Sequence, residues 1–103
     1  MGVDEAVAGF DWDAGNREKC QRHGVSIAEI EAMFKRPLAI RPDDRHSATE
    51  RRFLAVGRTA AGRWVFLAFT HRDRSGKVLI RPITARFMHR QEVRQYEEEN
   101  PDL

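Results

Sequence analysis

Two arginines occupy one apolar stretch of the chain, residues 80–86, with Arg81 inside the stretch and Arg86 at its end. Burying a guanidinium is costly unless an anion or a carboxylate meets it. The planar fork of arginine matches a phosphate group well. The stretch therefore fits two interpretations equally: a phosphate-binding site, or two structural ion pairs with acidic side chains elsewhere in the fold.

Histidine and glutamate side chains supply candidate groups for proton transfer. His23, at the end of a predicted helix, is a candidate acid or base because histidine changes charge near neutral pH, although interaction of its ring with its own helix C-terminus is the preferred interpretation. Glu50 opens a predicted strand and is expected to pair with Arg81 or Arg86, as a clamp or as an acid–base element. His71 stands at a strand exit, where it is placed to line a site. Such a set suits metal-free RNA cleavage, in which the ribose 2′-hydroxyl attacks and the protein supplies proton transfer and charge stabilisation.

The sequence gives no sign of a metal or cofactor site. The four histidines, at positions 23, 46, 71 and 89, fall on four different predicted elements, and no Cys or His pair has ligand spacing. No glycine-rich phosphate loop or dinucleotide fingerprint occurs. The single cysteine, Cys20, is expected to be packed inside a helix, and its isolation suits a reducing cytoplasm. No apolar run approaches the length that spans a membrane.

Charge is unevenly distributed along the second half of the chain. Of the 18 basic residues, fifteen are Arg, although the net charge is only +2. Residues 71–90 contain six Arg or Lys and one acid, whereas residues 91–103 contain five acids and one base. A basic band followed by an acidic tail is typical of a protein that binds a polyanion, with the tail able to counter the band.

The elements that must position these groups predict an α+β domain. Asp13 caps a helix that runs to His23, and Gly24 ends it. A capping box, serine to glutamate over residues 26–29, opens a second helix that extends to about Lys35. Residues 88–100 close the chain as an amphipathic helix, in which Tyr96 packs inward with a satisfied hydroxyl.

The middle of the chain predicts a sheet. Strands are expected over residues 38–40, 52–57, 63–70 and 77–85, with a polar loop at 41–49 and turns at 59–62 and 72–76. The short connections imply an antiparallel meander of about four strands, plus a short N-terminal strand near residues 10–13. Residues 1–9 are expected to be a flexible leader, and residues 10–100 a single domain.

Strand parity separates the two arginines of residues 80–86. Side chains five residues apart point to opposite faces of an uninterrupted strand, so Arg81 and Arg86 converge only if the chain bends near Pro82 or at the strand exit. Both faces of the strand at 63–70 are apolar. The face that the helices leave free is therefore partly covered, or it forms a binding surface.

Several of these segments, in this order, resemble the BrnT toxins of bacterial BrnT/BrnA toxin–antitoxin modules. The matching pieces are residues 10–13, Gly15-Asn16 with Lys19, 23–26, 50–53, 57–59, 62–63, 80–86 and 92–96. The resemblance covers residues 10–99 and implies a RelE/ParE-like fold and a cytoplasmic ribonuclease that blocks translation. It also implies a hetero-oligomer with a BrnA-like antitoxin, whose DNA-binding part represses the shared operon.

The leading hypothesis is a metal-independent endoribonuclease toxin. Arg81 and Arg86 are expected to bind the scissile phosphate, with His23 and Glu50 transferring protons. Further contacts to RNA are expected from four residues: Lys19, Arg22, Arg51 and His71. Many relatives carry a lysine where Arg22 stands, so the cation is kept without a lysine's capacity for proton transfer. The alternatives are a ParE-like toxin that inhibits DNA gyrase without cleaving RNA, and a nonenzymatic RNA- or protein-binding module.

Overall fold

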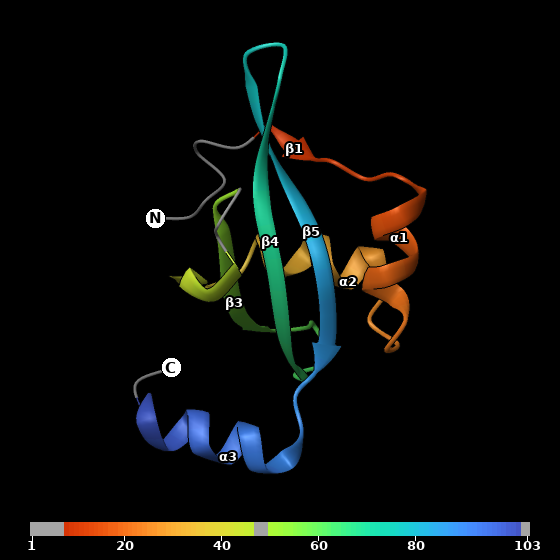
Figure 1. Ribbon diagram of the computed structural model, residues 1–103. Coiled ribbons are helices and arrows are strands. Elements are labelled where there is room, and N and C mark those ends of the chain that lie inside the picture. Colours follow the sequence, from red (N-terminus) through yellow and green to blue (C-terminus); the bar gives the residue numbers. More distant parts are fainter. Residues whose placement is uncertain (1–7, 47–49, 102–103) are drawn as a thin grey trace.

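The computed structural model describes residues 8–46 and 50–101 and shows three helices and a five-stranded sheet (Figure 1). The elements in chain order are β1 (Gly9–Phe10), α1 (Ala14–Gln21), α2 (Ile27–Met33), β2 (Ala39–Pro42), a 3-10 helix (Asp44–His46), β3 (Arg52–Arg58), β4 (Trp64–Arg74), β5 (Lys77–Phe87) and α3 (Arg90–Glu99). The strand order is β1-β5-β4-β3-β2. Strands β2 to β5 form an antiparallel meander, and β1 adds in parallel to β5. The predicted α+β class is confirmed; the RelE/ParE-like label remains a prediction.

Both N-terminal helices begin at the caps that the sequence predicts. Asp13 accepts the Asn16 backbone N–H at 3.1 Å, and the Asn16 side chain accepts the Asp13 N–H at 2.7 Å. Ser26 and Glu29 exchange the equivalent pair of bonds at 3.0 and 2.9 Å. These reciprocal bonds satisfy amide groups that have no partner within the helix. Gly24 follows α1 with φ +93°, a conformation that L side chains rarely adopt.

The β4–β5 hairpin is longer than predicted. The sequence places a turn at residues 72–76, but β4 continues to Arg74 and β5 begins at Lys77, which leaves Ser75 and Gly76 as the turn. Both have positive φ, 55° and 80°, as a tight hairpin requires. The charged residues 72–74 look like a loop in the sequence, yet the exposed end of a hairpin accepts charged side chains while its backbone ladder continues. Strand β2 likewise runs to Pro42, inside the predicted polar loop, whose residues 47–49 lie outside the described part of the chain.

Helices α1 and α2 lie together on one side of the sheet, whereas α3 lies beyond the end where β5 exits (Figure 1). Under α1 and α2, Val65, Leu67 and Phe69 of β4 are at most 1% exposed. On the opposite side of β4, Trp64 and Phe66 are half-buried. We call this second side, which α1 and α2 do not cover, the open face. No helix in the described ranges is long and apolar enough to cross a membrane.

A β-bulge in β5 decides where the two arginines point. Ala68 pairs with Thr84 and Phe69 with Pro82, so Ile83 is an extra residue on β5. An extra residue reverses the alternation of side chains beyond it. Arg81 pairs with Thr70, and Arg86 with Phe66. Both arginines therefore stand on the open face. The bulge at Ile83 supplies the interruption near Pro82 that the sequence analysis required for them to share a face.

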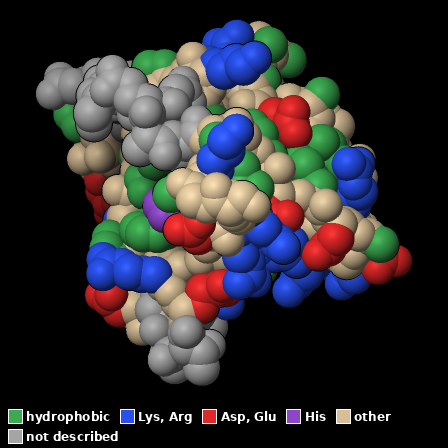
Figure 2. Space-filling model, turned by 90° about the horizontal axis from the view of Figure 1, so that it is seen from above, with side chains coloured by type: hydrophobic (Ala, Val, Ile, Leu, Met, Phe, Trp, Pro, Cys, Tyr) green, Lys and Arg blue, Asp and Glu red, His purple; other side chains and the backbone are tan. Residues whose placement is uncertain are grey.

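The same register brings other arginines to the open face. In β2, β3, β4 and β5, positions in register with the even-numbered residues of β4 share this face. The arginines at such positions are Arg41, Arg52, Arg58, Arg72, Arg74, Arg81 and Arg86. Viewed from the hairpin end, Lys and Arg side chains gather with Asp and Glu side chains among them (Figure 2). The open face is thus basic, and five of these arginines are paired with carboxylates: Arg58, Arg72, Arg74, Arg81 and Arg86.

Candidate functional site

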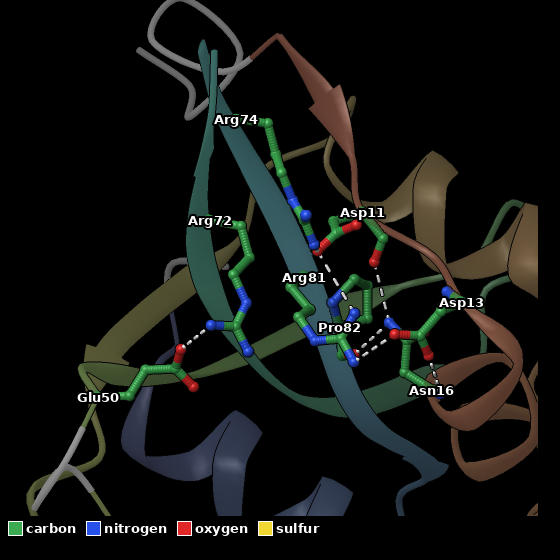
Figure 3. Close-up of polar contacts among 8 residues, drawn as sticks. All are labelled: Asp11, Asp13, Asn16, Glu50, Arg72, Arg74, Arg81 and Pro82. Carbon is green, nitrogen blue, oxygen red and sulfur yellow. Dashed lines mark hydrogen bonds and ion pairs between the residues drawn. The ribbon is translucent and has the colours of Figure 1, made fainter. Parts of the chain in front are cut away.

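Arg81 is held by two carboxylates from the segment that joins β1 to α1 (Figure 3). One guanidinium nitrogen, Nη1, lies 3.4 Å from Asp11 Oδ2, and the other, Nη2, lies 2.9 Å from Asp13 Oδ2. Asp11 also contacts Arg74 at 3.1 Å. The Arg81 side chain is 19% exposed and Asp11 is 13% exposed, whereas Asp13 is 55% exposed. Arg81 is therefore ion-paired in this structure. Asp11 is its less exposed partner and Asp13 is its accessible partner.

Asn16 fixes the geometry of this cluster. Its buried side-chain amide donates to the carbonyls of Asp11 at 3.0 Å and Pro82 at 2.9 Å, while its oxygen completes the cap of α1. The Asn16 backbone N–H, and then the Arg81 guanidinium, hold the pKa of Asp13 below its usual value. The cap of α1 thus also positions the carboxylates around Arg81, and Asp13 stays ionised beside it.

A hollow of about 320 Å³ lies beside Arg81, between α1 and β5. Its lining consists of Gly15, Asn16, Lys19, Arg81, Pro82 and Ile83. We call it the α1–β5 hollow. It brings together two of the predicted site residues, Lys19 and Arg81, from elements more than sixty residues apart in sequence. A flexible ammonium and a planar guanidinium around one small hollow suit a phosphate group.

His23 and Arg22 lie at the other end of α1, away from its cap. Both are exposed, and the Arg22 guanidinium lies 3.9 Å from the Glu18 carboxylate. His23 follows Lys19 by four residues, about one helical turn. His23 therefore lies beyond the C-terminal end of α1, and it does not line the α1–β5 hollow.

Glu50 pairs with Arg72 of β4 at 2.6 Å (Figure 3), so the expectation that it pairs with Arg81 or Arg86 is wrong. The reason is strand order, because β3 neighbours β4 and not β5. Arg72 stands on the open face, as Arg81 does.

Arg51 and His71 meet over one aromatic ring at the same end of β3. The Arg51 guanidinium lies 5.7 Å from the centre of the Phe53 ring, and the His71 ring lies 5.2 Å from it. Phe53 and His71 belong to the face of the sheet opposite Arg81. These two predicted RNA contacts therefore form a group separate from the α1–β5 hollow.

Arg86 turns toward α3. Its two terminal nitrogens each contact one oxygen of Glu92 at 2.8 Å, and its guanidinium lies 5.1 Å from the Phe66 ring. Arg86, together with the backbone N–H of His89, lowers the pKa of Glu92 to about 2. Arg86 and Arg81 are in register with Phe66 and Thr70, four residues apart, so their backbones lie roughly 13 Å apart. With different partners, the two guanidiniums do not converge on one point in this state.

Other predictions have mixed outcomes. Cys20 is fully buried, and burial raises the pKa of its thiol to about 11, which confirms a packed residue. The predicted partner for the Tyr96 hydroxyl is wrong, because this buried oxygen has no hydrogen-bond partner among the described residues. In residues 8–46 and 50–101, no three His, Cys, Asp or Glu side chains are grouped to hold a metal ion.

Sequence reasoning missed Asp11 and the structural part that Asn16 plays, and it used Asp13 only as a cap. The available signal was two acids spaced around Trp12 just before a helix, because such spacing offers carboxylates to a neighbouring strand. That neighbour was not evident, since β1 pairs with β5 across seventy residues of sequence.

These features define a small α+β protein with a cationic hollow suited to a phosphate-bearing ligand. A family model described as "Ribonuclease toxin, BrnT, of type II toxin-antitoxin system" matches residues 12–92. This match spans most of the chain, so the chain belongs to the BrnT family. It is a ribonuclease toxin of a type II toxin–antitoxin system, and its partner is a protein antitoxin. Comparison with curated proteins gives no match. The family match favours the ribonuclease hypothesis over gyrase inhibition or a nonenzymatic module.

Proposed function

We propose that this ribonuclease toxin is an endoribonuclease that works without a metal ion and binds the scissile phosphate in the α1–β5 hollow. The observation that carries the proposal is the meeting of Lys19 and Arg81 in that hollow, with Arg81 held in place by Asp11. A guanidinium already oriented before substrate arrives stabilises developing charge without further reorganisation.

The reaction is attack of the ribose 2′-hydroxyl on the adjacent phosphorus, with departure of the 5′-oxygen and formation of a 2′,3′-cyclic phosphate. The phosphoryl oxygens gain negative charge as this proceeds, and Arg81 and Lys19 neutralise it. Asp13 is the exposed partner of Arg81, so the incoming phosphate displaces it. Asp11, which is deeper, keeps the guanidinium aligned.

Proton transfer is assigned to His23 and Glu50. His23 lies in the turn that follows α1, four residues after Lys19, and Glu50 pairs with Arg72, which stands on the open face. Arg86 contacts a second phosphate further along the same RNA strand, because it shares the open face roughly 13 Å away. Contacts to flanking nucleotides are assigned to Arg22, Arg51 and His71.

The biological setting that we propose is the one implied by the resemblance to BrnT toxins. The toxin acts on RNA in the cytoplasm and inhibits translation. Its antitoxin is a BrnA-like protein that binds DNA and forms a hetero-oligomer with the toxin. Purification of the toxin with the product of the adjoining reading frame, followed by operator binding, tests this part independently of catalysis.

Cleavage of RNA in EDTA by matched arginine variants tests the site. Arg81→Ala should lower kcat about 100- to 1,000-fold, as loss of one donor to a developing oxyanion does. Arg74→Ala is the control, because Arg74 also contacts Asp11 but does not line the α1–β5 hollow; its rate should stay within about threefold of the parent, as for a surface charge. Thermal unfolding checks that both variants fold.

Two outcomes would overturn the proposal. Equal losses in Arg81→Ala and Arg74→Ala would mean that overall charge, not the hollow, supports cleavage. Activity that disappears in EDTA and returns with Mg²⁺ would reject the metal-free reaction, whatever the arginine variants do.

A further inference from the structure

A second concave region lies on the open face, between β2, β3 and α3. This groove has a volume of about 510 Å³. Leu54, Val56 and Phe66 contribute apolar side chains from the sheet, whereas Glu92, Tyr96 and Glu99 face it from α3. We call it the α3 groove. It shares no lining residue with the α1–β5 hollow.

Helix α3 is only lightly attached to the rest of the domain, since none of its residues is buried. Its described contacts include the Arg86–Glu92 pair, a 3.8 Å contact between Arg58 and Glu97, and Tyr96 packed 5.3 Å from Trp64. Exposed ion pairs of this kind contribute little stability. The wall of the groove is therefore able to adjust to an occupant.

The hydroxyl of Tyr96 is an independent sign that the groove is incomplete. The oxygen is buried, yet it has no hydrogen-bond partner among the described residues. A buried hydroxyl without a hydrogen-bond partner is unfavourable. A small shift of α3 around an occupant that offers a carbonyl group removes this cost.

Charge and apolarity decide what kind of occupant fits. Glu92 and Glu99 line the groove on α3, and residues 97–99 of that helix are all glutamate. Carboxylates repel RNA phosphates, and an apolar floor offers a phosphate backbone no donors. A protein segment with apolar side chains flanked by Lys or Arg satisfies both features.

We infer that the α3 groove is the docking site of the antitoxin, through an amphipathic segment whose apolar side chains fill the floor and whose basic side chains meet Glu92 and Glu99. Arg41, on the opposite wall, pairs with an acidic residue of the same segment. Docking here leaves the α1–β5 hollow free of direct contact with this segment. The inference rests on the toxin–antitoxin family and not on the proposed catalytic residues.

The test uses full-length toxin variants and the protein encoded by the adjoining reading frame, labelled for fluorescence anisotropy. Leu54→Arg puts a charge on the apolar floor and should weaken binding at least about thirtyfold, as for a central interface residue. Glu99→Arg reverses a charge that faces the groove and should weaken binding about five- to tenfold, most strongly at low salt. Glu98→Arg is the matched control, because Glu98 is on the same helix but does not line the groove.

RNA cleavage by the same variants separates this inference from the proposed function. Leu54→Arg and Glu99→Arg should cleave RNA at the parental rate while resisting neutralisation. Parental antitoxin affinity in both variants overturns the inference and leaves the catalytic proposal standing. Loss of RNA binding with antitoxin affinity retained also overturns it, since the groove would then be an RNA path. If the adjoining product does not bind the parent toxin at all, the inference is rejected.

Discussion

Two parts of β5 hold their arginines in different ways: the middle of the strand beside the start of α1, which we call the α1 end, and the last residues before α3, which we call the α3 end. At the α1 end, Arg81 contacts Asp11 and Asp13, which lie 70 and 68 positions earlier in the chain. At the α3 end, Arg86 contacts Glu92, only six positions later. Arg81 is 19% exposed and Arg86 is 38% exposed. One arginine is thus fixed by tertiary structure and the other by a local turn.

This difference predicts different roles for the two ends. A group fixed by distant, well-packed partners keeps its geometry when substrate binds, which is what charge stabilisation in a reaction needs. A group held by a neighbouring helix moves when that helix moves. We therefore expect changes at the α1 end to affect the whole fold and catalysis, and changes at the α3 end to remain local.

The largest effect on stability is expected for Asn16→Ala at the α1 end. The change removes bonds to the carbonyls of Asp11 and Pro82 and half of the capping box. With a buried carbonyl left unsatisfied and a cap weakened, the free energy of unfolding should fall by about 2–3 kcal/mol, measured by urea denaturation. Cleavage should fall as well, because Asp11 and Asp13 lose their positions around Arg81.

Asn100→Ala is the matched change at the α3 end. Asn100 donates to the Tyr96 carbonyl at 2.9 Å at the end of α3, and both residues are only half-buried. Its cost should stay below about 1 kcal/mol, as for one partly solvated hydrogen bond. Equal costs for the two asparagine variants would remove the distinction between the two ends of β5.

Local sequence signals predicted much of this fold. The caps at Asp13 and Ser26, the left-handed residue at Gly24 and the order of the elements all depend on residues within a few positions of one another, so they are legible in the sequence. The β4–β5 hairpin was underestimated because its charged end, residues 72–74, has the composition of a loop.

The candidate site was harder to predict because its contacts are nonlocal. Glu50 had several arginines available, and only the order of strands selects Arg72. The bulge at Ile83 changes which face Arg86 occupies, yet nothing in the composition of residues 80–86 marks the bulged residue. The sequence predicted Arg81 and Lys19 as site residues, while their meeting in one hollow required α1 to pack against β5.

A double-mutant cycle between Arg86 and Glu92 should give a small, local coupling. Both side chains are 38% exposed, so solvent screens the pair despite its two 2.8 Å contacts. The coupling free energy from urea denaturation of Arg86→Ala, Glu92→Ala and the double variant should be about 0.5–1 kcal/mol. A coupling of several kcal/mol would show that α3 is part of the cooperative core, contrary to the comparison.

The smallest effect is expected when the pH is lowered. The fluorescence of each tryptophan reports on one end of β5. Trp12 donates to Glu31 near the α1 end, and Trp64 packs against Tyr96 at the α3 end. Arg86 lowers the pKa of Glu92 from its ordinary 4.5 to about 2. The stabilisation from this carboxylate is therefore complete above pH 4.5 and is lost as the pH falls through 2.

In a Trp12→Phe background, Trp64 fluorescence should change over that window as α3 loosens. Adding Glu92→Gln should remove the pH-dependent step, since the amide cannot ionise. An unchanged step in the Glu92→Gln variant would assign the transition to other carboxylates, including Asp13, and would place the acid-sensitive contact at the α1 end instead.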